Sequence, residues 1–188
     1  MQVRDATLAD ARRIAEIHVA AWKAAYRGIM PDELLDGLSV DDRERSWREQ
    51  LRDERQRTCV VLDRETIVGW ASCGDCHDDD VPAGTAEVYG IYLDPAWWRR
   101  GAGRTLWESV LREAARNGAR SLTVRVLEAN ANASRFYEAM GGVLDPTGRK
   151  MICRGGTKMA EVRYRYLVGV RTDDVTRLGK PPTMKQNH

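Results

Sequence analysis

The stretch RRGAGR, residues 99–104, combines two glycines and three arginines at the point where a strand pattern gives way to a helix pattern. Glycine lets bare backbone come close to a ligand, and the N–H groups at the start of a helix attract an anion. The arginines add positive charge around the same point, so a phosphate group fits this chemistry. A tight turn with a basic, solvated rim is the other interpretation of the same residues.

Two familiar phosphate-binding loops do not match this stretch. A P-loop ends in Gly-Lys-Ser or Gly-Lys-Thr, which RRGAGR lacks, and a dinucleotide-binding loop has a third small residue where this chain has Leu106. The stretch therefore predicts neither kind of nucleotide site.

A second candidate site is CGDCH, which contains Cys73, Cys76 and His77. This spacing is that of covalent haem attachment, and a CxxC pair can also supply half of a zinc site. Haem attachment of this type belongs with export, yet the first twenty residues carry charges of both signs and no apolar run of signal-peptide length. The sequence has no second CxxC to complete a zinc shell. We therefore expect no metal, and we interpret CGDCH and the following HDDDVPAGT as an exposed acidic turn between two strands.

The composition limits the partners that the protein can take. Thirty basic and 28 acidic side chains leave a net charge of +2, which is too balanced for the broad basic face of a nucleic-acid-binding protein. No segment approaches the ~18 apolar residues of a membrane span. We expect a cytoplasmic protein with a small anionic ligand, no nucleic-acid partner and no membrane partner.

Periodicity indicates one α/β domain over residues 1–170 and a tail, residues 171–188, that is predicted to be disordered. The elements expected in chain order are a strand at 2–6, a helix to Tyr26, a short helix at 31–37, a helix from Ser39, a hairpin at 58–73, a strand at 86–94, a helix from the glycine-rich stretch to Asn117, a strand at 121–127, a helix at 130–142, and strands at 143–152 and 158–169. Strand, turn, helix and strand form a βαβ crossover, so the strands ending at Leu93 and Leu127 should be parallel neighbours.

The strand at 86–94 contains Gly90, and a glycine inside a strand suggests a bulge or a close backbone approach. Regular alternation would place Glu87, Tyr89, Ile91 and Leu93 on one face, and Val88, Gly90 and Tyr92 on the other.

The segment EVYGIYLDPAWWRRGAGRTLWESVL resembles the acyl-CoA-binding segment of the GNAT superfamily of N-acetyltransferases, and NANASRFYEAMGG resembles the motif that follows it in that superfamily. The resemblance extends over residues 2–170 and includes AAWKAAYRGIMPDELLDGL near the start and EVRYRY near the end. One position departs from the pattern: Trp98 stands where the family usually has Gln or Arg, which removes one polar contact.

The resemblance implies a GNAT-like α/β fold, with a central mixed sheet of about six to seven strands and about four flanking helices. It implies transfer of the acetyl group from acetyl-CoA to a primary amine, on a small molecule or a peptide, by direct attack in a ternary complex. No cysteine falls inside the matched motifs to serve a ping-pong route. A monomer and a homodimer both remain open. The alternative function is a non-catalytic acyl-CoA-binding sensor, against which the presence of Glu87 and Tyr137 argues.

The resemblance also implies where coenzyme A is held. The expected pyrophosphate cradle consists of Arg99, Arg100, Gly101, Ala102, Gly103 and Arg104. The strand residues Ile91, Tyr92 and Leu93 would pair through their backbone with the pantetheine arm, as an added strand does. The Leu93 N–H would polarise the thioester carbonyl. Asn130 would hydrogen-bond the pantetheine region, or alternatively cap a helix.

Acetyl transfer needs a neutral amine and a proton for the departing thiolate. The resemblance implies that Glu87 accepts the amine proton, directly or through water, and its alternative role is that of an exposed carboxylate at a strand edge. Tyr137 matches the family tyrosine that protonates the thiolate, and a buried packing tyrosine is the alternative. Trp22 and Tyr26 lie one helical turn apart next to the expected acceptor pocket, where aromatic walls would suit a cationic amine, although such a stripe is commonly core.

Overall fold

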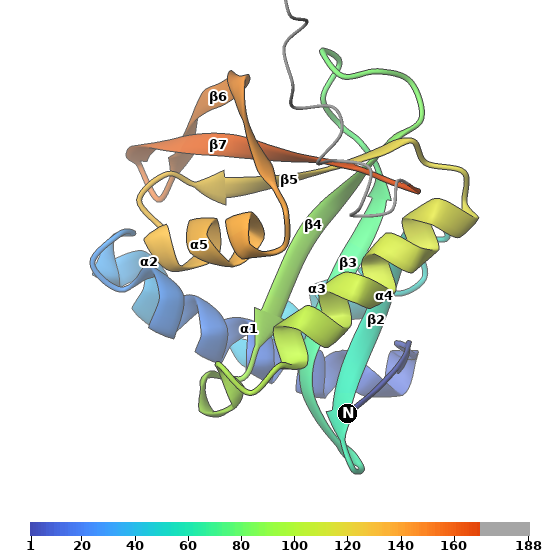
Figure 1. The fold of residues 1–188 in the computed structure, drawn as a ribbon. Coiled ribbons are helices and arrows are strands. Elements are labelled where there is room, and N and C mark those ends of the chain that lie inside the picture. The colour runs from blue at the N-terminus through green and yellow to red at the C-terminus, as the bar shows by residue number, and fades with distance from the viewer. Residues whose placement is uncertain (170–188) are drawn as a thin grey trace, which may run out of the picture.

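The computed structural model describes residues 1–169, which form one seven-stranded mixed sheet with helices on both faces (Figure 1). The strands are β1 (Gln2–Asp5), β2 (Gln56–Asp63), β3 (Thr66–Asp75), β4 (Thr85–Leu93), β5 (Ser121–Leu127), β6 (Val143–Arg154) and β7 (Thr157–Leu167). The helices are α1 (Ala11–Tyr26), α2 (Asp32–Asp36), α3 (Val40–Gln50), α4 (Ala102–Arg116) and α5 (Ala131–Ala139), with short 3-10 helices η1 (Leu8–Asp10) and η2 (Pro95–Trp97). The predicted α/β fold of six to seven strands is confirmed, with five described α-helices against a prediction of about four. The predicted tail at 171–188 lies outside the described residues.

The strand order is β1-β2-β3-β4-β5-β7-β6, and within the described sheet β4 and β5 are the one parallel pair. The glycine-rich turn and α4 connect these two strands, so the predicted βαβ crossover is confirmed. A parallel pair needs such a crossover, and this one places the start of α4 next to the end of β4.

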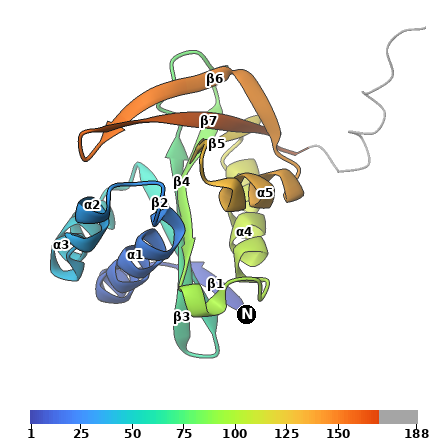
Figure 2. The ribbon, with the colours of Figure 1, turned by 90° about the vertical axis from the view of Figure 1, so that its left-hand side faces the viewer.

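The helices form a layer on each face of the sheet: α1, α2 and α3 lie on one side, and α4 and α5 lie on the other (Figure 2). Apolar residues at helical spacing explain both layers. Ile14 and Ile17 of α1 pack with Trp47 of α3 against one face, whereas Leu106 and Trp107 of α4 pack against the other. The sheet is thus buried on both faces around its centre.

The pairing of β4 with β5 stops halfway along both strands. Residues 85–88 of β4 pair with residues 121–124 of β5. Beyond them β4 continues to Leu93 and β5 to Leu127 without pairing with each other (Figure 1). The strands diverge beyond this point, so the centre of the sheet opens there and leaves backbone groups of β4 without a strand partner.

A β-bulge interrupts β4 at the predicted glycine. Ser72 pairs with Gly90 and Cys73 pairs with Val88, so Tyr89 has no partner on β3. The extra residue shifts the alternation. The predicted faces are therefore wrong beyond the bulge: Ile91 and Leu93 pack with Val88 in the cluster beneath α4, and Tyr92 packs in the cluster beneath α1.

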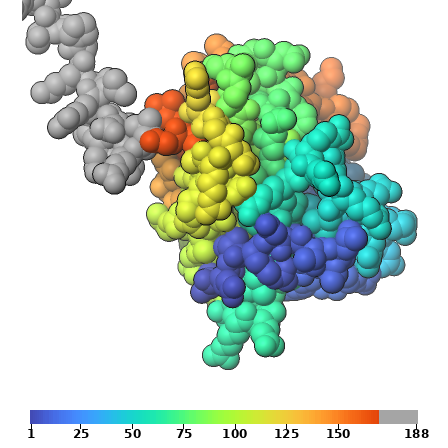
Figure 3. Space-filling model, turned by 90° about the vertical axis from the view of Figure 1, so that its right-hand side faces the viewer, coloured from blue at the N-terminus to red at the C-terminus, as the bar shows by residue number. Residues whose placement is uncertain are grey.

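Figure 3 shows the side of the molecule on which α4 lies, and there the β2–β3 turn projects from the body. Arg57 of β2 and Glu113 of α4 form an ion pair at 2.5 Å on this side. No helix among residues 1–169 is long and apolar enough to span a bilayer.

Candidate functional site

The opening between β4 and β5 is a cleft of about 920 Å³. Its walls come from α1, the outer half of β4, the glycine-rich turn, β5 and α5. It is therefore bounded by the elements that carry the two sequence motifs, which β5 separates along the chain. A cleft of this size where parallel strands separate is a common position for a ligand in α/β proteins.

Two backbone amides of β4 face the cleft. The Asp94 N–H donates to the Val68 carbonyl at 2.9 Å, which makes this pair the hydrogen-bonded one at the end of the β3–β4 ladder. In an antiparallel pair bonded and non-bonded positions alternate, so Ile91 and Leu93 direct their N–H groups away from β3. With β5 unpaired here, these donors are open to a ligand.

The glycine-rich turn places backbone and charge at the same cleft. Gly101 precedes α4 with φ +88°, a left-handed conformation that glycine adopts without strain, and Arg99 has φ +62°. The cleft is lined by Arg99, Gly101, Gly103 and Arg104. A side chain at Gly103 would begin 3.2 Å from the Phe136 ring, a tight contact that the ring would have to move to relieve. The turn thus presents the N-terminus of a 15-residue helix to the cleft.

Two of the six predicted cradle residues do not line the cleft. The guanidinium of Arg100 lies over the Trp97 ring at 5.1 Å from the centroid, in a cation–π contact. Ala102 is fully buried under the first turn of α4. Both residues support the turn, and the remaining four form its cleft-facing surface.

Tyr137 lies in the wall of the cleft on α5 and is 6% exposed. Its backbone carbonyl accepts a hydrogen bond from the Tyr166 hydroxyl at 2.8 Å, and its ring meets Trp107 edge to face at 5.6 Å. Burial raises the pKa of the Tyr137 phenol, so the hydroxyl keeps its proton at neutral pH. Within residues 1–169 no group hydrogen-bonds this hydroxyl, which leaves its proton for a ligand in the cleft.

Asn130 lines the cleft and also caps a helix. Its Oδ1 accepts a hydrogen bond from the Ala133 N–H at 3.1 Å, which fixes the start of α5 and with it the position of Tyr137. The capping alternative is therefore confirmed for the oxygen. Asn130 is 7% exposed, and its amide nitrogen stays a candidate for a ligand contact.

The aromatic stripe of α1 divides between the cleft and the core. Tyr26 lines the cleft, with its hydroxyl 3.1 Å from that of Tyr92. Trp22 lies behind Tyr26, edge to face at 5.3 Å, and the guanidinium of Arg43 covers its ring. His18 belongs to the core, since burial lowers its pKa to about 3 and it accepts a hydrogen bond from the Trp47 indole at 3.2 Å.

Glu87 does not line the cleft. It is 8% exposed and lies beneath the segment 76–84, whose His77 backbone N–H donates to the Glu87 Oε2 at 3.0 Å. The His77 Nδ1 is 3.3 Å from the same oxygen. The alternative of an exposed carboxylate at a strand edge is thus wrong, because the 76–84 segment covers it.

The segment 76–84 is an exposed loop between β3 and β4, as its sequence predicts, but it is also anchored to the sheet. The carboxylate of Asp78 is almost buried and pairs with Arg125 of β5 at 2.6 Å and with Arg163 of β7 at 2.9 Å. Arg163 is 1% exposed and also binds Asp80 and Asp145. Sequence reasoning missed this network because its members are separated by up to 85 residues, and HDDD alone does not reveal the two arginines.

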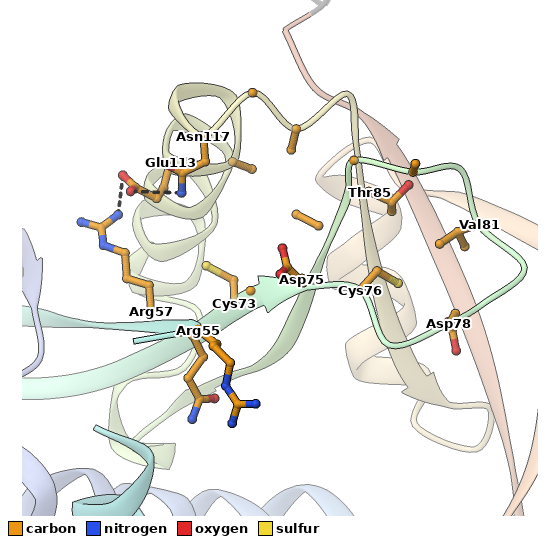
Figure 4. A pocket seen from close by; sticks show the side chains of 18 of the residues that line it. Arg55, Arg57, Cys73, Asp75, Cys76, Asp78, Val81, Thr85, Glu113 and Asn117 are labelled. Carbon is orange, nitrogen blue, oxygen red and sulfur yellow. Dashed lines mark hydrogen bonds and ion pairs between the residues drawn. The ribbon is translucent and has the colours of Figure 1, made fainter. Parts of the chain in front are cut away.

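A second cavity, of about 520 Å³, lies between this segment and the end of α4 (Figure 4). It contains Cys73 and Cys76, whose thiols point in opposite directions. Cys76 Sγ is 3.4 Å from the Thr123 hydroxyl, and burial raises the pKa of the Cys73 thiol to about 11. Among residues 1–169 no three His, Cys, Asp or Glu side chains are placed together to hold a metal ion.

Comparison with known proteins gives three findings. The model of the acetyltransferase (GNAT) family matches residues 11–142. The chain is 31% identical over 138 residues to the uncharacterized N-acetyltransferase YuaI of Bacillus subtilis, covering 73% of this chain and 77% of that protein. It is 29% identical over 143 residues to an L-methionine sulfoximine/L-methionine sulfone acetyltransferase of Salmonella typhimurium, covering 75% and 79%.

Solved structures show the same fold. A GCN5-related N-acetyltransferase from Rhodopseudomonas palustris matches with a TM-score of 0.70 and 23% identity over 89% of this chain and 95% of that one. The yncA protein of Salmonella typhimurium, a putative acetyltransferase solved with acetyl-CoA, matches with a TM-score of 0.68 and 22% identity over 91% and 95%.

Proposed function

Because the chain belongs to the acetyltransferase (GNAT) family, we propose that it transfers the acetyl group of acetyl-CoA to a primary amine by direct attack, in the cleft between β4 and β5. The chain is an acetyl-CoA-dependent N-acetyltransferase, and the proposal concerns its residues and its acceptor. The observation that carries it is the pair of unpartnered amides on β4, directed into a cleft that also receives the N-terminus of α4.

The glycine-rich turn would hold the pyrophosphate. Its backbone at Gly101 and Gly103, the dipole of α4 and the guanidinium groups of Arg99 and Arg104 all favour a doubly charged anion at one point. The missing Cβ at Gly103 supports this, because the space beside Phe136 is tight for a side chain. Arg100 and Ala102 would act indirectly, by keeping the turn in shape.

The outer half of β4 would hold the pantetheine arm. An amide-bearing chain laid beside Ile91 and Leu93 can pair with them as an added strand does, because β5 has left that position. The Leu93 N–H would donate to the thioester oxygen and stabilise the negative charge that develops there. Asn130 would add a side-chain amide, whereas the backbone of Tyr92 is directed toward Trp70 of β3 and would not pair with the arm as expected.

Tyr137 would protonate the departing thiolate. Its hydroxyl is buried, protonated and without another partner in the described chain, which are the properties of a general acid.

The acceptor must also lose a proton before it can attack: a primary alkylamine with pKa near ~10.4 costs about 4–5 kcal/mol to deprotonate at pH 7. We propose that Glu87 supports this deprotonation, and that it does so through a neighbouring group because it does not line the cleft.

The acceptor would enter past Tyr26, whose ring and hydroxyl form the cleft wall on the α1 side, with Trp22 behind it. The relative from Salmonella typhimurium is an L-methionine sulfoximine/L-methionine sulfone acetyltransferase. A small molecule with an α-amino group is therefore the first acceptor class to test, with peptide amines as the other class. A cytoplasmic location and a monomeric or homodimeric state stay predictions.

The test is calorimetric titration of acetyl-CoA into the protein, followed by thiol release over a panel of L-methionine sulfone, L-methionine sulfoximine, spermidine and a lysine peptide. We expect binding and a release that depends on one class of amine. Tyr137→Phe should still bind acetyl-CoA, while its turnover falls by a factor of about 10²–10⁴. Binding without release from any amine would favour the alternative of an acyl-CoA sensor. Absence of binding would refute the assignment of the cleft.

A further inference from the structure

We propose that His77 is the residue that takes the proton of the acceptor amine, and that Glu87 orients its imidazole; this rests on the acetyltransferase function proposed above. His77 lies outside the segments that resemble the family motifs, in the acidic segment that precedes β4. Three features support this role: the geometry of the pair, the access of each member to the cleft, and the anchoring of the segment that carries His77.

Glu87 faces one nitrogen of the imidazole and leaves the other available. The Oε2 of Glu87 is 3.3 Å from Nδ1 of His77 and 3.0 Å from the His77 backbone nitrogen, which donates to it. A carboxylate at Nδ1 favours the tautomer with its proton on that nitrogen, so the lone pair is on Nε2. The same carboxylate stabilises the imidazolium once Nε2 has accepted a proton. This is the arrangement of a general base with its orienting group.

The two members of the pair differ in their access to a substrate. The Glu87 side chain is 10% exposed and lies under the segment, whereas the His77 side chain is 75% exposed. The imidazole packs on the ring of Tyr89 with 4.9 Å between centroids, and Tyr89 lines the cleft on the β4 side. Neither side chain lines the cleft, but His77 is the more exposed member and adjoins the cleft wall through Tyr89, so it is the member that a proton from the amine would reach through water.

The residues next to His77 are fixed in place. Asp78 binds Arg125, itself a cleft residue, and Arg163. Arg163 in turn holds Asp80 and Asp145, so three carboxylates converge on one buried guanidinium. Tyr89 donates its hydroxyl to the Asp75 carbonyl on the other side. These contacts order an exposed segment, which reduces the entropy cost of positioning the base.

The charged and titratable groups that face His77 come from the segment itself and from β4. Glu87 and Tyr89 belong to β4, and Asp78 belongs to the segment, with its charge compensated by Arg125 of β5 and Arg163 of β7. Glu87 is the carboxylate in this group without an arginine partner among residues 1–169, which leaves its charge to act on the imidazole.

The proton balance of the step closes with these groups. The ammonium first gives one proton to Nε2 of His77, through an intervening water. The neutral amine nitrogen then bonds to the thioester carbon and releases its second proton to water. The carbon–sulfur bond breaks, and the thiolate receives the phenolic proton of Tyr137. His77 releases its proton to the surrounding water and Tyr137 regains one, so that one ammonium and one thioester give one amide, one thiol and one free proton.

The test compares His77→Gln with the unsubstituted protein on two kinds of amine. The first is the amine of the panel above that is acetylated fastest, and the second is hydroxylamine, which is already uncharged at neutral pH. We expect kcat/KM for the alkylamine to fall about 10²–10⁴-fold and that for hydroxylamine to fall less than about tenfold, after subtraction of the rate without enzyme. Misplacement of the cleft would lower both rates alike, and equal losses would overturn the assignment.

Two further variants keep the result interpretable. Asp79→Asn changes an exposed charge of the same segment and should leave both rates unchanged. His77→Ala should recover alkylamine turnover on addition of imidazole while binding acetyl-CoA normally by calorimetry. Full alkylamine activity in His77→Gln would refute the role of His77 and leave the acetyltransferase standing. Absence of thiol release by the unsubstituted protein from every amine would instead refute the proposed function, and this inference with it.

Discussion

The indole nitrogen of Trp98 donates a hydrogen bond to the backbone carbonyl of Leu93, with 3.1 Å between the two atoms. Leu93 ends β4 and directs its own N–H into the cleft, and Trp98, which is 39% exposed, lines that cleft. The hydrogen bond therefore links Trp98 to Leu93, whose backbone N–H would bind the thioester. Tryptophan at this position, where the family usually has Gln or Arg, fixes the end of the strand by a donor of its own.

Trp98→Phe should weaken acetyl-CoA binding about five-fold with kcat changed less than two-fold. The substitution keeps an aromatic wall but removes the donor to Leu93, and one such hydrogen bond contributes ~1 kcal/mol. Calorimetric titration and steady-state kinetics measure the two quantities. An unchanged dissociation constant would mean that the end of β4 is held without this bond.

Gly103→Val should raise the dissociation constant of acetyl-CoA at least ten-fold. A Cβ at this position already lies 3.2 Å from the Phe136 ring, so two further methyl groups must displace that ring or project into the cleft. The matched control is Gly118→Ala at the other end of α4, where φ is +76° and no atom lies within 4 Å. The control should lower the melting temperature through backbone strain and leave binding unchanged. Weaker binding in Gly118→Ala with normal binding in Gly103→Val would contradict the assignment of the glycine-rich turn as the pyrophosphate site.

Local signals made most of the fold predictable from the sequence. The glycine-rich turn between two apolar strands predicts the βαβ crossover, and Gly90 predicts the bulge, because both features need only neighbours in the chain. The consequence of the bulge was not predictable in the same way. Which faces Ile91 and Tyr92 occupy depends on where the extra residue is inserted, and a single glycine does not specify that.

The environment of Glu87 shows the same limit for the site. Its strand position follows from alternation, but its burial comes from a segment that Arg125 and Arg163 hold from β5 and β7. Those pairings join residues far apart in sequence, and a run of acidic residues indicates a solvated turn unless its partners are known. The family motifs placed Tyr137 correctly in the cleft wall because α5 directly follows β5.

Arg163→Met should lower the free energy of unfolding by about 3–5 kcal/mol, because it leaves Asp78, Asp80 and Asp145 around a buried position without their common counter-charge. Urea unfolding at neutral pH measures this change. Arg149→Met is the control: it removes an exposed ion pair with Glu128, and should cost no more than about 1 kcal/mol. Adding Asp145→Asn to Arg163→Met should recover part of the loss. Equal effects of the two arginine substitutions would show that the network does not stabilise the fold.

His18→Gln should remove part of the pH dependence of stability between pH 7 and pH 5. Burial lowers the pKa of His18 to about 3 in the folded protein, against ~6.5 in the unfolded chain, so the unfolded chain binds the proton first as the pH falls. The stability is therefore complete above pH ~6.5 and declines below it by ~1.4 kcal/mol per pH unit, which amounts to about 2 kcal/mol at pH 5. Glutamine keeps an acceptor near the Trp47 indole but does not titrate. Urea unfolding of both proteins at the two pH values measures the difference. Asp10 pairs with Arg4, and its pKa in the folded protein is lowered to about 2. Asp10 in the folded protein therefore stays ionised between pH 7 and pH 5. A decline of the same size in both proteins would place the pH dependence elsewhere and would mean that the His18 ring accepts a proton without unfolding the core.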